Sequence, residues 1–299
     1  MSVGPGVNPL TREWLAARRA RRYRLAPELR LRTVEEARAY VQDMGFCLFW
    51  PIQGVELPNM FHAIAGRVRD VPDEHGDPDV GKSWGWKDDS LDKRWWYYGK
   101  LIRKRATMVS LDLLPCFYAC SGNYGDYERD YLDEYRDGQI SVEARNLYEA
   151  LLTHGPLHTV ELRQKARMAN DTAKYRFDKT LAELQAQLKI LPVGVAAAGA
   201  WQYAFIYDIL PRYYPDLQAQ ARPISRREAQ KTLILRHLRN VIAASRDELF
   251  KALDVLGWTK REFEGTVGGL IEEGQVRETP VDGYEGTYLI AKPATEAQG

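Results

Sequence analysis

Residues 171–206 read DTAKYRFDKTLAELQAQLKILPVGVAAAGAWQYAFI, and their pattern is the clearest indication of the fold class. Its first half repeats large apolar residues at spacings of four, three and four, namely Phe177, Leu181, Leu184 and Leu188. That period predicts a helix from about Asp171 to Leu188 with one apolar face. Ile190–Val193 then predicts a strand, Gly194–Ala200 a loop of small residues, and Trp201–Ile206 a returning strand. A helix that leads directly into a two-stranded hairpin is therefore expected.

The residues before this stretch predict two more helices. Residues 141–153 place four apolar side chains on one helical face, Ala144, Leu147, Tyr148 and Leu151. The turn His154-Gly155-Pro156 ends that helix, and Val160–Ala166 predicts a short second helix. Three helices closed by a hairpin are the order of elements in a winged helix, a variant of the helix-turn-helix.

The same order is predicted a second time, roughly 80 residues further along the chain. Two capping boxes, Ser225–Glu228 and Thr259–Glu262, are expected to begin helices. Ser245 caps a shorter helix between them, and Gln275–Glu278 and Thr287–Ala291 predict strands around a turn-rich tip. The repetition favours tandem winged-helix modules over the alternative, an unrelated α+β domain with helical hairpins.

The first part of the chain is less regular. A capping box at Thr33 precedes a predicted helix that ends at Met44-Gly45, and Leu57–Ala65 predicts another. Residues 69–90 are polar and rich in turn residues, which predicts a long loop. A strand over Lys100–Val109 and a helix over Leu111–Cys120 are expected after it.

Together these patterns predict an α+β fold, mostly helical, made of tandem winged-helix modules with short β-hairpins. We expect an N-terminal winged-helix-like domain over residues 1–140, with a large insertion near 69–90. Winged-helix domains are expected over 141–215 and 222–293.

Positive charge is gathered in patches although the formal net charge of the 299 residues is only +1. Arg12–Arg32 holds eight arginines against two glutamates, and Lys93–Arg105 holds six basic residues and no acidic one. Arg222–Arg239 holds six basic residues and one acidic one. Such patches attract polyanions, although arginines also commonly solvate helix faces.

Cysteine usage and apolar content indicate where the protein works. The three cysteines form no C-x-x-C pair, which favours reduced thiols. The N-terminus lacks the apolar core of a signal peptide, and the apolar stretch around Val193–Trp201 is too short to span a bilayer. We expect a cytoplasmic, nucleoid-associated protein outside the membrane.

Two segments carry candidate DNA contacts. In a winged helix the third helix enters the major groove, and its solvent face in the first of these modules presents Thr172, Arg176 and Lys179. In the second module Arg261 stands beside carboxylates, so packing or partner binding is an equally good interpretation of that helix.

The other segment, residues 84–105, interleaves aromatic and basic side chains. Aromatic rings stack on unpaired bases and cations hold phosphates, whereas dense tryptophans are more often core anchors. We expect a mixture, with some rings buried and the basic residues outside.

The chain resembles the AlkZ/YcaQ-type DNA glycosylases, a tandem winged-helix family. The resemblance rests on the order of four segments: LTREWLAARRARRYRLA at 10–26, the helix ending in Met44-Gly45, LIRKRATMVSLDLLP at 101–115 and GPLHTVELRQKA at 155–166. It implies a DNA-binding channel, removal of alkylated bases or unhooking of crosslinks, and no metal.

The family's catalytic motif is a Gln-aliphatic-Gln or Gln-aliphatic-Asp triplet after its second helix, which positions water. At that spacing from Gly45 this chain has Leu48-Phe49-Trp50, which cannot accept a proton from water. Gln53 and Glu56 follow shortly after and are the candidates for a displaced catalytic pair.

The resemblance also implies DNA contacts on a basic strand. Arg105 and Thr107 match the family's Arg-Gly-Thr-x-His pattern, whereas Val109 replaces its histidine. Arg103 and Lys104 precede this pattern and extend the predicted DNA contact.

Three hypotheses about function follow, and none of them requires a cofactor. The first is a DNA-binding protein of this family that acts in repair or protection of damaged DNA. The second is a DNA glycosylase that uses Gln53 and Glu56, and the third is a winged-helix transcription regulator. In each, the expected partner is double-stranded DNA, including damaged DNA, and the expected state is a monomer.

Overall fold

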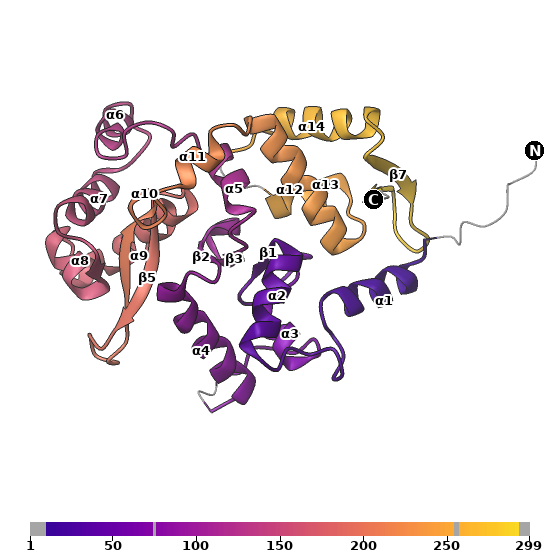
Figure 1. Ribbon diagram of the computed structural model, residues 1–299, viewed down its shortest axis with the longest axis horizontal. Helices are drawn as coiled ribbons and strands as arrows, with labels where there is room; N and C mark the ends of the chain where they lie inside the picture. The colour runs from indigo at the N-terminus through magenta and orange to yellow at the C-terminus, as the bar shows by residue number, and fades with distance from the viewer. Residues whose placement is uncertain (1–9, 74–75, 254–256, 293–299) are drawn as a thin grey trace, which may run out of the picture.

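A computed structural model describes residues 10–73, 76–253 and 257–292 (Figure 1). Within these residues, the order helix, strand, helix, helix, strand, strand occurs twice, and a third repeat has the same order with an isolated bridge at Ala244 in place of its first strand. In the first two repeats the first strand pairs with the last, so the last strand lies in the middle of a three-stranded antiparallel sheet. In the third repeat the sheet has two strands, and Ala244 bridges the last of them at Leu289. We call the repeats unit one, unit two and unit three. The fold is α+β and mostly helical, as predicted.

Unit one lies low in the centre of Figure 1. Its elements are α2 (Val34–Met44), β1 (Phe46–Leu48), α3 (Met60–Ala65), α4 (Pro78–Lys93), β2 (Tyr97–Lys100) and β3 (Ala106–Val109). The sheet order is β1-β3-β2, with Val109 opposite both Phe46 and Tyr97. The predicted strand over Lys100–Val109 was wrong in part, because a 3₁₀ turn, η1 (Ile102–Lys104), separates the two strands.

The long loop predicted over residues 69–90 was also wrong, because much of it is helix α4. Asp77 caps this helix by accepting hydrogen bonds from the amides of Asp79 and Val80, and Pro78 occupies the first turn. The buried side of α4 includes the polar residues Ser83, Lys87 and Ser90, so it lacks the apolar period of a helix. The third helix of unit one therefore stands where an insertion was expected.

Unit two lies to the left in Figure 1. Its elements are α7 (Val142–His154), β4 (Leu157–His158), α8 (Thr159–Lys165), η2 (Asp171–Ala173), α9 (Lys174–Ala186), β5 (Ile190–Ala196) and β6 (Ala204–Ile209). The sheet order is β4-β6-β5. The predicted helices and hairpin of residues 141–206 are present, and β4 is a short additional strand.

Unit three lies at the upper right of Figure 1. Its elements are α12 (Arg226–Val241), α13 (Arg246–Leu253), α14 (Lys260–Glu272), β7 (Val276–Pro280) and β8 (Thr287–Ala291). Both predicted capping boxes form at Ser225 and Thr259. Helix α12 ends before Ala244, whose backbone instead bridges Leu289 of β8.

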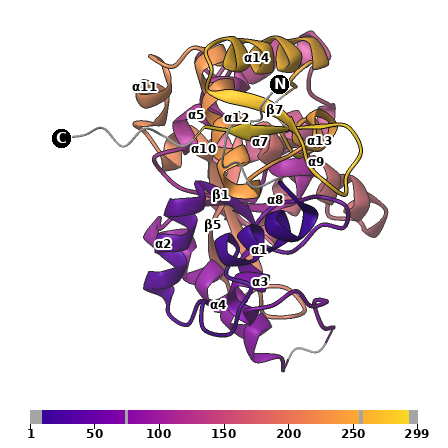
Figure 2. The same cartoon turned by 90° about the vertical axis from the view of Figure 1, so that its right-hand side faces the viewer.

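Further helices join the units: α1 (Arg12–Arg22), α5 (Leu114–Ser121), α6 (Asp130–Arg136), α10 (Leu210–Tyr213) and α11 (Leu217–Ala221). Helix α1 packs on unit three, with Leu15 buried among Ala243, Val281 and Tyr288 (Figure 2). Its N-cap residue Thr11 forms a parallel bridge with Asp282. The start of the chain thus holds the hairpin near its end.

Apolar packing divides unevenly among the units. One continuous cluster contains Phe46 of unit one, Phe117 of α5, and Leu233 and Phe263 of unit three. Unit two has a cluster of its own around residues such as Phe177. Units one and three therefore share a core, to which unit two adds Leu191 of β5. Among the described residues, no helix has the length and apolarity required to cross a membrane.

Candidate nucleic-acid interface

The turn between β2 and β3 forms a basic loop, Arg103–Arg105. Arg103 and Lys104 have φ values of +51° and +55°, in the left-handed region that is costly for residues with side chains. Thr107 holds this shape, because its Oγ1 accepts from the Ile102 amide at 3.1 Å and donates to the Arg105 carbonyl at 2.8 Å. The three basic side chains of the loop are exposed.

The predicted contacts of this segment therefore separate into two kinds. Thr107 is fully buried and supports the loop from beneath. The side chains of Arg103 and Arg105 make no hydrogen bond or ion pair with any other described residue. Lys104 pairs with Glu183 of α9 at 3.4 Å and keeps 55% of its side chain exposed. The loop thus offers two uncommitted guanidinium groups to solvent.

The exposed face of α9 lies next to the basic loop. Lys179 reaches the same carboxylate as Lys104, since its Nζ lies 3.9 Å from Glu183 Oε1. Arg176 pairs with Glu143 at 3.4 Å and keeps 59% of its side chain exposed. Thr172, in η2 just before the helix, is exposed as well. The structure thus brings the predicted contacts of α9 and the basic loop onto neighbouring surface.

The hairpins of units one and two each contact the third helix of the other unit. We call β2–β3 hairpin one and β5–β6 hairpin two. Hairpin one lies against α9, where the Lys100 amide donates to Gln185 Oε1 at 3.1 Å. Hairpin two lies against α4, where Tyr203 stacks edge-on against Trp84. This exchange fixes the two third helices relative to each other.

An aromatic cluster surrounds this second contact. It consists of Phe49, Trp50, Trp84, Tyr98, Tyr203 and Phe205. The position of the family's catalytic triplet, Leu48-Phe49-Trp50, therefore contributes two rings to packing. Trp96 is buried while Trp84 is 38% exposed, so the rings of the segment are the mixture that was expected. The expectation that its basic residues lie outside was wrong for Lys87, which is fully buried.

Lys87 lies inside the aromatic cluster and was missed by the sequence analysis. Its Nζ lies 3.5 Å from the centre of the Trp84 ring, donates to the Tyr203 hydroxyl at 2.8 Å, and pairs with Asp88 at 3.0 Å. Burial lowers the pKa of Lys87 to about 8, and Asp88 opposes that shift. Only a helical prediction for residues 78–93 would have placed Lys87 on the inner face of α4.

The candidate catalytic residues Gln53 and Glu56 have different surroundings from each other. Gln53 is exposed in a turn. Glu56 pairs with Arg19 of α1 at 3.1 Å, and Arg19 also donates to the carbonyls of Val241 and Ala243. In this structure Glu56 therefore helps to hold α1 against unit three, and its catalytic role stays a prediction.

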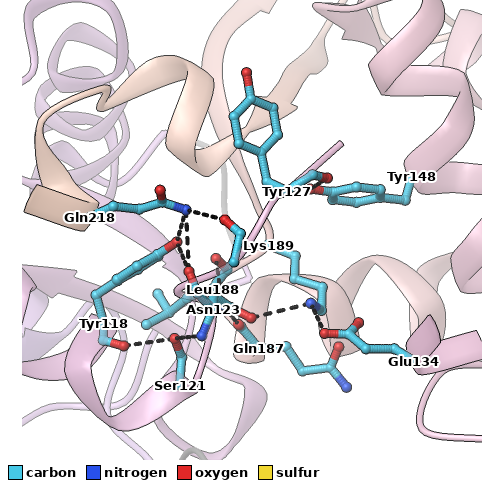
Figure 3. Close-up of polar contacts among 11 residues, drawn as sticks. Tyr118, Ser121, Asn123, Tyr127, Glu134, Tyr148, Gln187, Leu188, Lys189 and Gln218 are labelled. Carbon is cyan, nitrogen blue, oxygen red and sulfur yellow. Dashed lines mark hydrogen bonds and ion pairs between the residues drawn. The ribbon is translucent and has the colours of Figure 1, made fainter. Parts of the chain in front are cut away.

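A polar hollow of about 530 Å³ opens beside the basic loop, and Lys104 is one of its lining residues. Inside it, Lys189 Nζ donates to Glu134 Oε1 at 2.7 Å and to Asn123 Oδ1 at 3.2 Å (Figure 3). Glu134 Oε2 and Gln187 Oε1 are buried and have no hydrogen-bond partner among the described residues. The lining of this hollow therefore combines buried oxygens that could accept hydrogen bonds with the cationic side chain of Lys104. Across residues 10–73, 76–253 and 257–292, no group of three or more His, Cys, Asp or Glu residues could hold a metal ion.

One protein family matches most of this chain. The family model described as AlkZ related matches residues 31–254, so the chain belongs to the AlkZ-related family. The matched residues cover units one and two and the first helices of unit three, and α14 and its hairpin lie beyond them. No curated protein and no solved structure matches the chain.

Proposed function

We propose that this chain is a DNA-binding protein made of three winged-helix units. The repeated order of helix, strand, helix, helix, strand, strand supports this proposal, because a winged helix has this order and pairs its first strand with its last. The hairpins are then the wings, and α4, α9 and α14 are the third helices. The domain boundaries expected from the sequence remain proposals.

One observation carries the DNA-binding proposal: Arg103 and Arg105 are exposed and unpaired within the described residues, beside the exposed cations of α9. Arginine forks bind phosphate oxygens through two parallel hydrogen bonds. Neighbouring carboxylates compete weakly, since Arg176 and Lys179 stand 3.4 Å and 3.9 Å from theirs. The relation to the AlkZ-related family supports duplex DNA as the polyanion. We propose that the protein acts in repair or protection of damaged DNA.

The test is duplex binding measured by fluorescence anisotropy over a range of salt concentrations. The double variant Arg103→Ala/Arg105→Ala is expected to bind a 20-base-pair duplex at least ~10-fold more weakly near physiological salt, with a smaller salt dependence. Arg176→Ala and Lys179→Ala are expected to weaken binding as well. Arg129→Ala is the control, because its side chain is 85% exposed on the loop before α6.

Equal affinity of the double variant and the wild type would refute this interface. Comparing an alkylated duplex with an undamaged one then tests the finer proposal, since a repair protein is expected to prefer the damaged duplex.

A further inference from the structure

Unit three carries a second cationic surface that the proposed DNA interface does not use. Helices α12 and α14 border an open hollow of about 570 Å³. Three arginines line it, Arg226 and Arg227 from α12 and Arg261 from α14. Glu262 is the acidic residue of its lining, so positive charge exceeds negative charge around the hollow.

The three guanidinium groups are held in different ways. Arg226 is oriented by Glu262, whose Oε1 lies 3.0 Å from its Nε, and by the Cys120 carbonyl. Arg227 and Arg261 are exposed, and neither side chain makes a hydrogen bond or an ion pair with another described residue. Two guanidinium forks are thus available to an anion next to one that is fixed in place.

Glycines in α14 shape the floor of the hollow. A Cβ atom at Gly269 would lie 2.8 Å from Arg227 Nη2, so the absence of a side chain lets Arg227 lie along the helix. A Cβ atom at Gly265 would meet nothing within 4 Å, and Gly265 lines the hollow. Glycine weakens a helix interior, and packing explains only the first of these two positions.

A buried amide completes the floor. Gln230 is 3% exposed and contacts the Thr266 hydroxyl at 3.0 Å. Its other amide atom, Nε2, is buried and has no hydrogen-bond partner among the described residues. Buried polar atoms are usually paired, so the floor has hydrogen-bonding capacity that the described protein atoms leave unused.

We propose that this hollow is a binding site for a phosphate group. Arginine binds phosphate bidentately, and three guanidinium groups around one open floor match the several oxygens of a phosphate or a diphosphate. The phosphate belongs either to the DNA backbone or to a free phosphorylated small molecule. This site is separate from the proposed DNA interface, and its residues include α14, which lies beyond the matched part of the family.

Isothermal titration calorimetry with inorganic pyrophosphate tests the site in the full chain. Arg227→Ala and Arg261→Ala are each expected to weaken pyrophosphate binding at least ~10-fold, since a charge-assisted contact of this strength is typical of such pairs. Arg277→Ala is the matched control, because Arg277 is an exposed arginine of β7 in the same unit. Its affinity is expected to equal that of the wild type.

Gly265→Leu tests the site without removing charge. Leucine favours the helix and fills the hollow, so the variant is expected to unfold at or above the wild-type temperature and to lose pyrophosphate binding. A wild-type chain that does not bind pyrophosphate overturns the proposal. So does equal binding by the wild type and the three hollow variants.

A second arm identifies the source of the phosphate. If the DNA backbone supplies it, Arg227→Ala and Arg261→Ala weaken binding to the 20-base-pair duplex as well as to pyrophosphate. If a free ligand supplies it, duplex binding is unchanged while pyrophosphate binding falls. The double variant Arg103→Ala/Arg105→Ala tests the DNA interface through duplex binding, whereas the hollow variants test the phosphate site through pyrophosphate binding. Either proposal can therefore be refuted without the other.

Discussion

Lys87 carries its amine in surroundings made largely of aromatic rings. Its side chain is completely buried, yet Asp88 and the Tyr203 hydroxyl are its only polar contacts among the described residues. Lysine is rarely buried without a partner, because removing the ammonium group from water is costly. Here the ring faces and one carboxylate together replace part of the lost hydration.

The pKa of Lys87 predicts a pH dependence of stability. In the folded chain the pKa is lowered from 10.5 to about 8, so the folded state releases this proton before the unfolded state does. The contribution of Lys87 to the free energy of unfolding should therefore rise by roughly 3 kcal/mol as the pH rises from 8 to 10.5.

Urea unfolding of the wild type and of Lys87→Met at pH 7.5 and 10, which together span most of this window, measures the contribution. Relative to Lys87→Met, the wild type is expected to have a higher free energy of unfolding at pH 10 than at pH 7.5. Lys93→Met on the same helix, where the side chain is 47% exposed, should show no such change. A constant difference for Lys87→Met would contradict the prediction.

The helices of this chain differ in how far their sequences reveal them. Capping boxes at Thr33, Ser225 and Thr259 identified three helix starts correctly, because the cap and its partner lie within one turn of sequence. Helix α4 was missed because its inner face is polar and meets hairpin two, which lies more than a hundred residues away. Long-range partners of this kind leave no local pattern.

The candidate site follows the same rule. The exposure of Arg176 and Lys179 was predictable from the helical period of α9, whereas the carboxylates that face them come from other turns and elements. The burial of Thr107 was not predictable, since a threonine in a strand faces either side. The hollow beside the basic loop joins Lys104, Glu134 and Lys189, which no sequence spacing relates.

The basic loop should depend on the hydroxyl group of Thr107. Thr107→Val removes the acceptor of the Ile102 amide and the donor to the Arg105 carbonyl in a fully buried place. The free energy of unfolding is expected to fall by about 2 kcal/mol, and duplex affinity should fall with it as the loop loses its left-handed shape. Thr107→Ser keeps the hydroxyl group and should retain most of the duplex affinity.

Thermal unfolding and fluorescence anisotropy measure the two effects. If Thr107→Val binds duplex DNA as tightly as Thr107→Ser, the shape of the loop does not matter for binding.

Units one and three are joined by α5 and α12. Phe117 of α5 is fully buried and stacks edge-on against Phe46 of β1, with ring centres 5.5 Å apart. The same cluster contains Leu233 and Phe263 of unit three. Although the order of elements repeats along the chain, units one and three are therefore not expected to unfold independently of each other.

Phe117→Ala should weaken units one and three together. The expected loss is about 4 kcal/mol, from the transfer of the ring and the cavity it leaves. Hydrogen exchange followed by mass spectrometry should show faster exchange in both β1–β3 and α12–α14. Leu147→Ala, in the separate core of unit two, should accelerate exchange chiefly within α7–α9. Faster exchange in unit one alone would contradict a shared core.

The exchange of hairpins between units one and two limits how this chain can change in evolution. Tyr203 near the end of hairpin two closes the space over Lys87, so the length of one hairpin sets the solvent access of a lysine in the other unit. A deletion of a few residues at that tip would admit water to the amine and restore its ordinary basicity. Insertions and deletions in either hairpin are thus constrained by the neighbouring unit, because a change in the length of one hairpin alters the surroundings of side chains in the other unit.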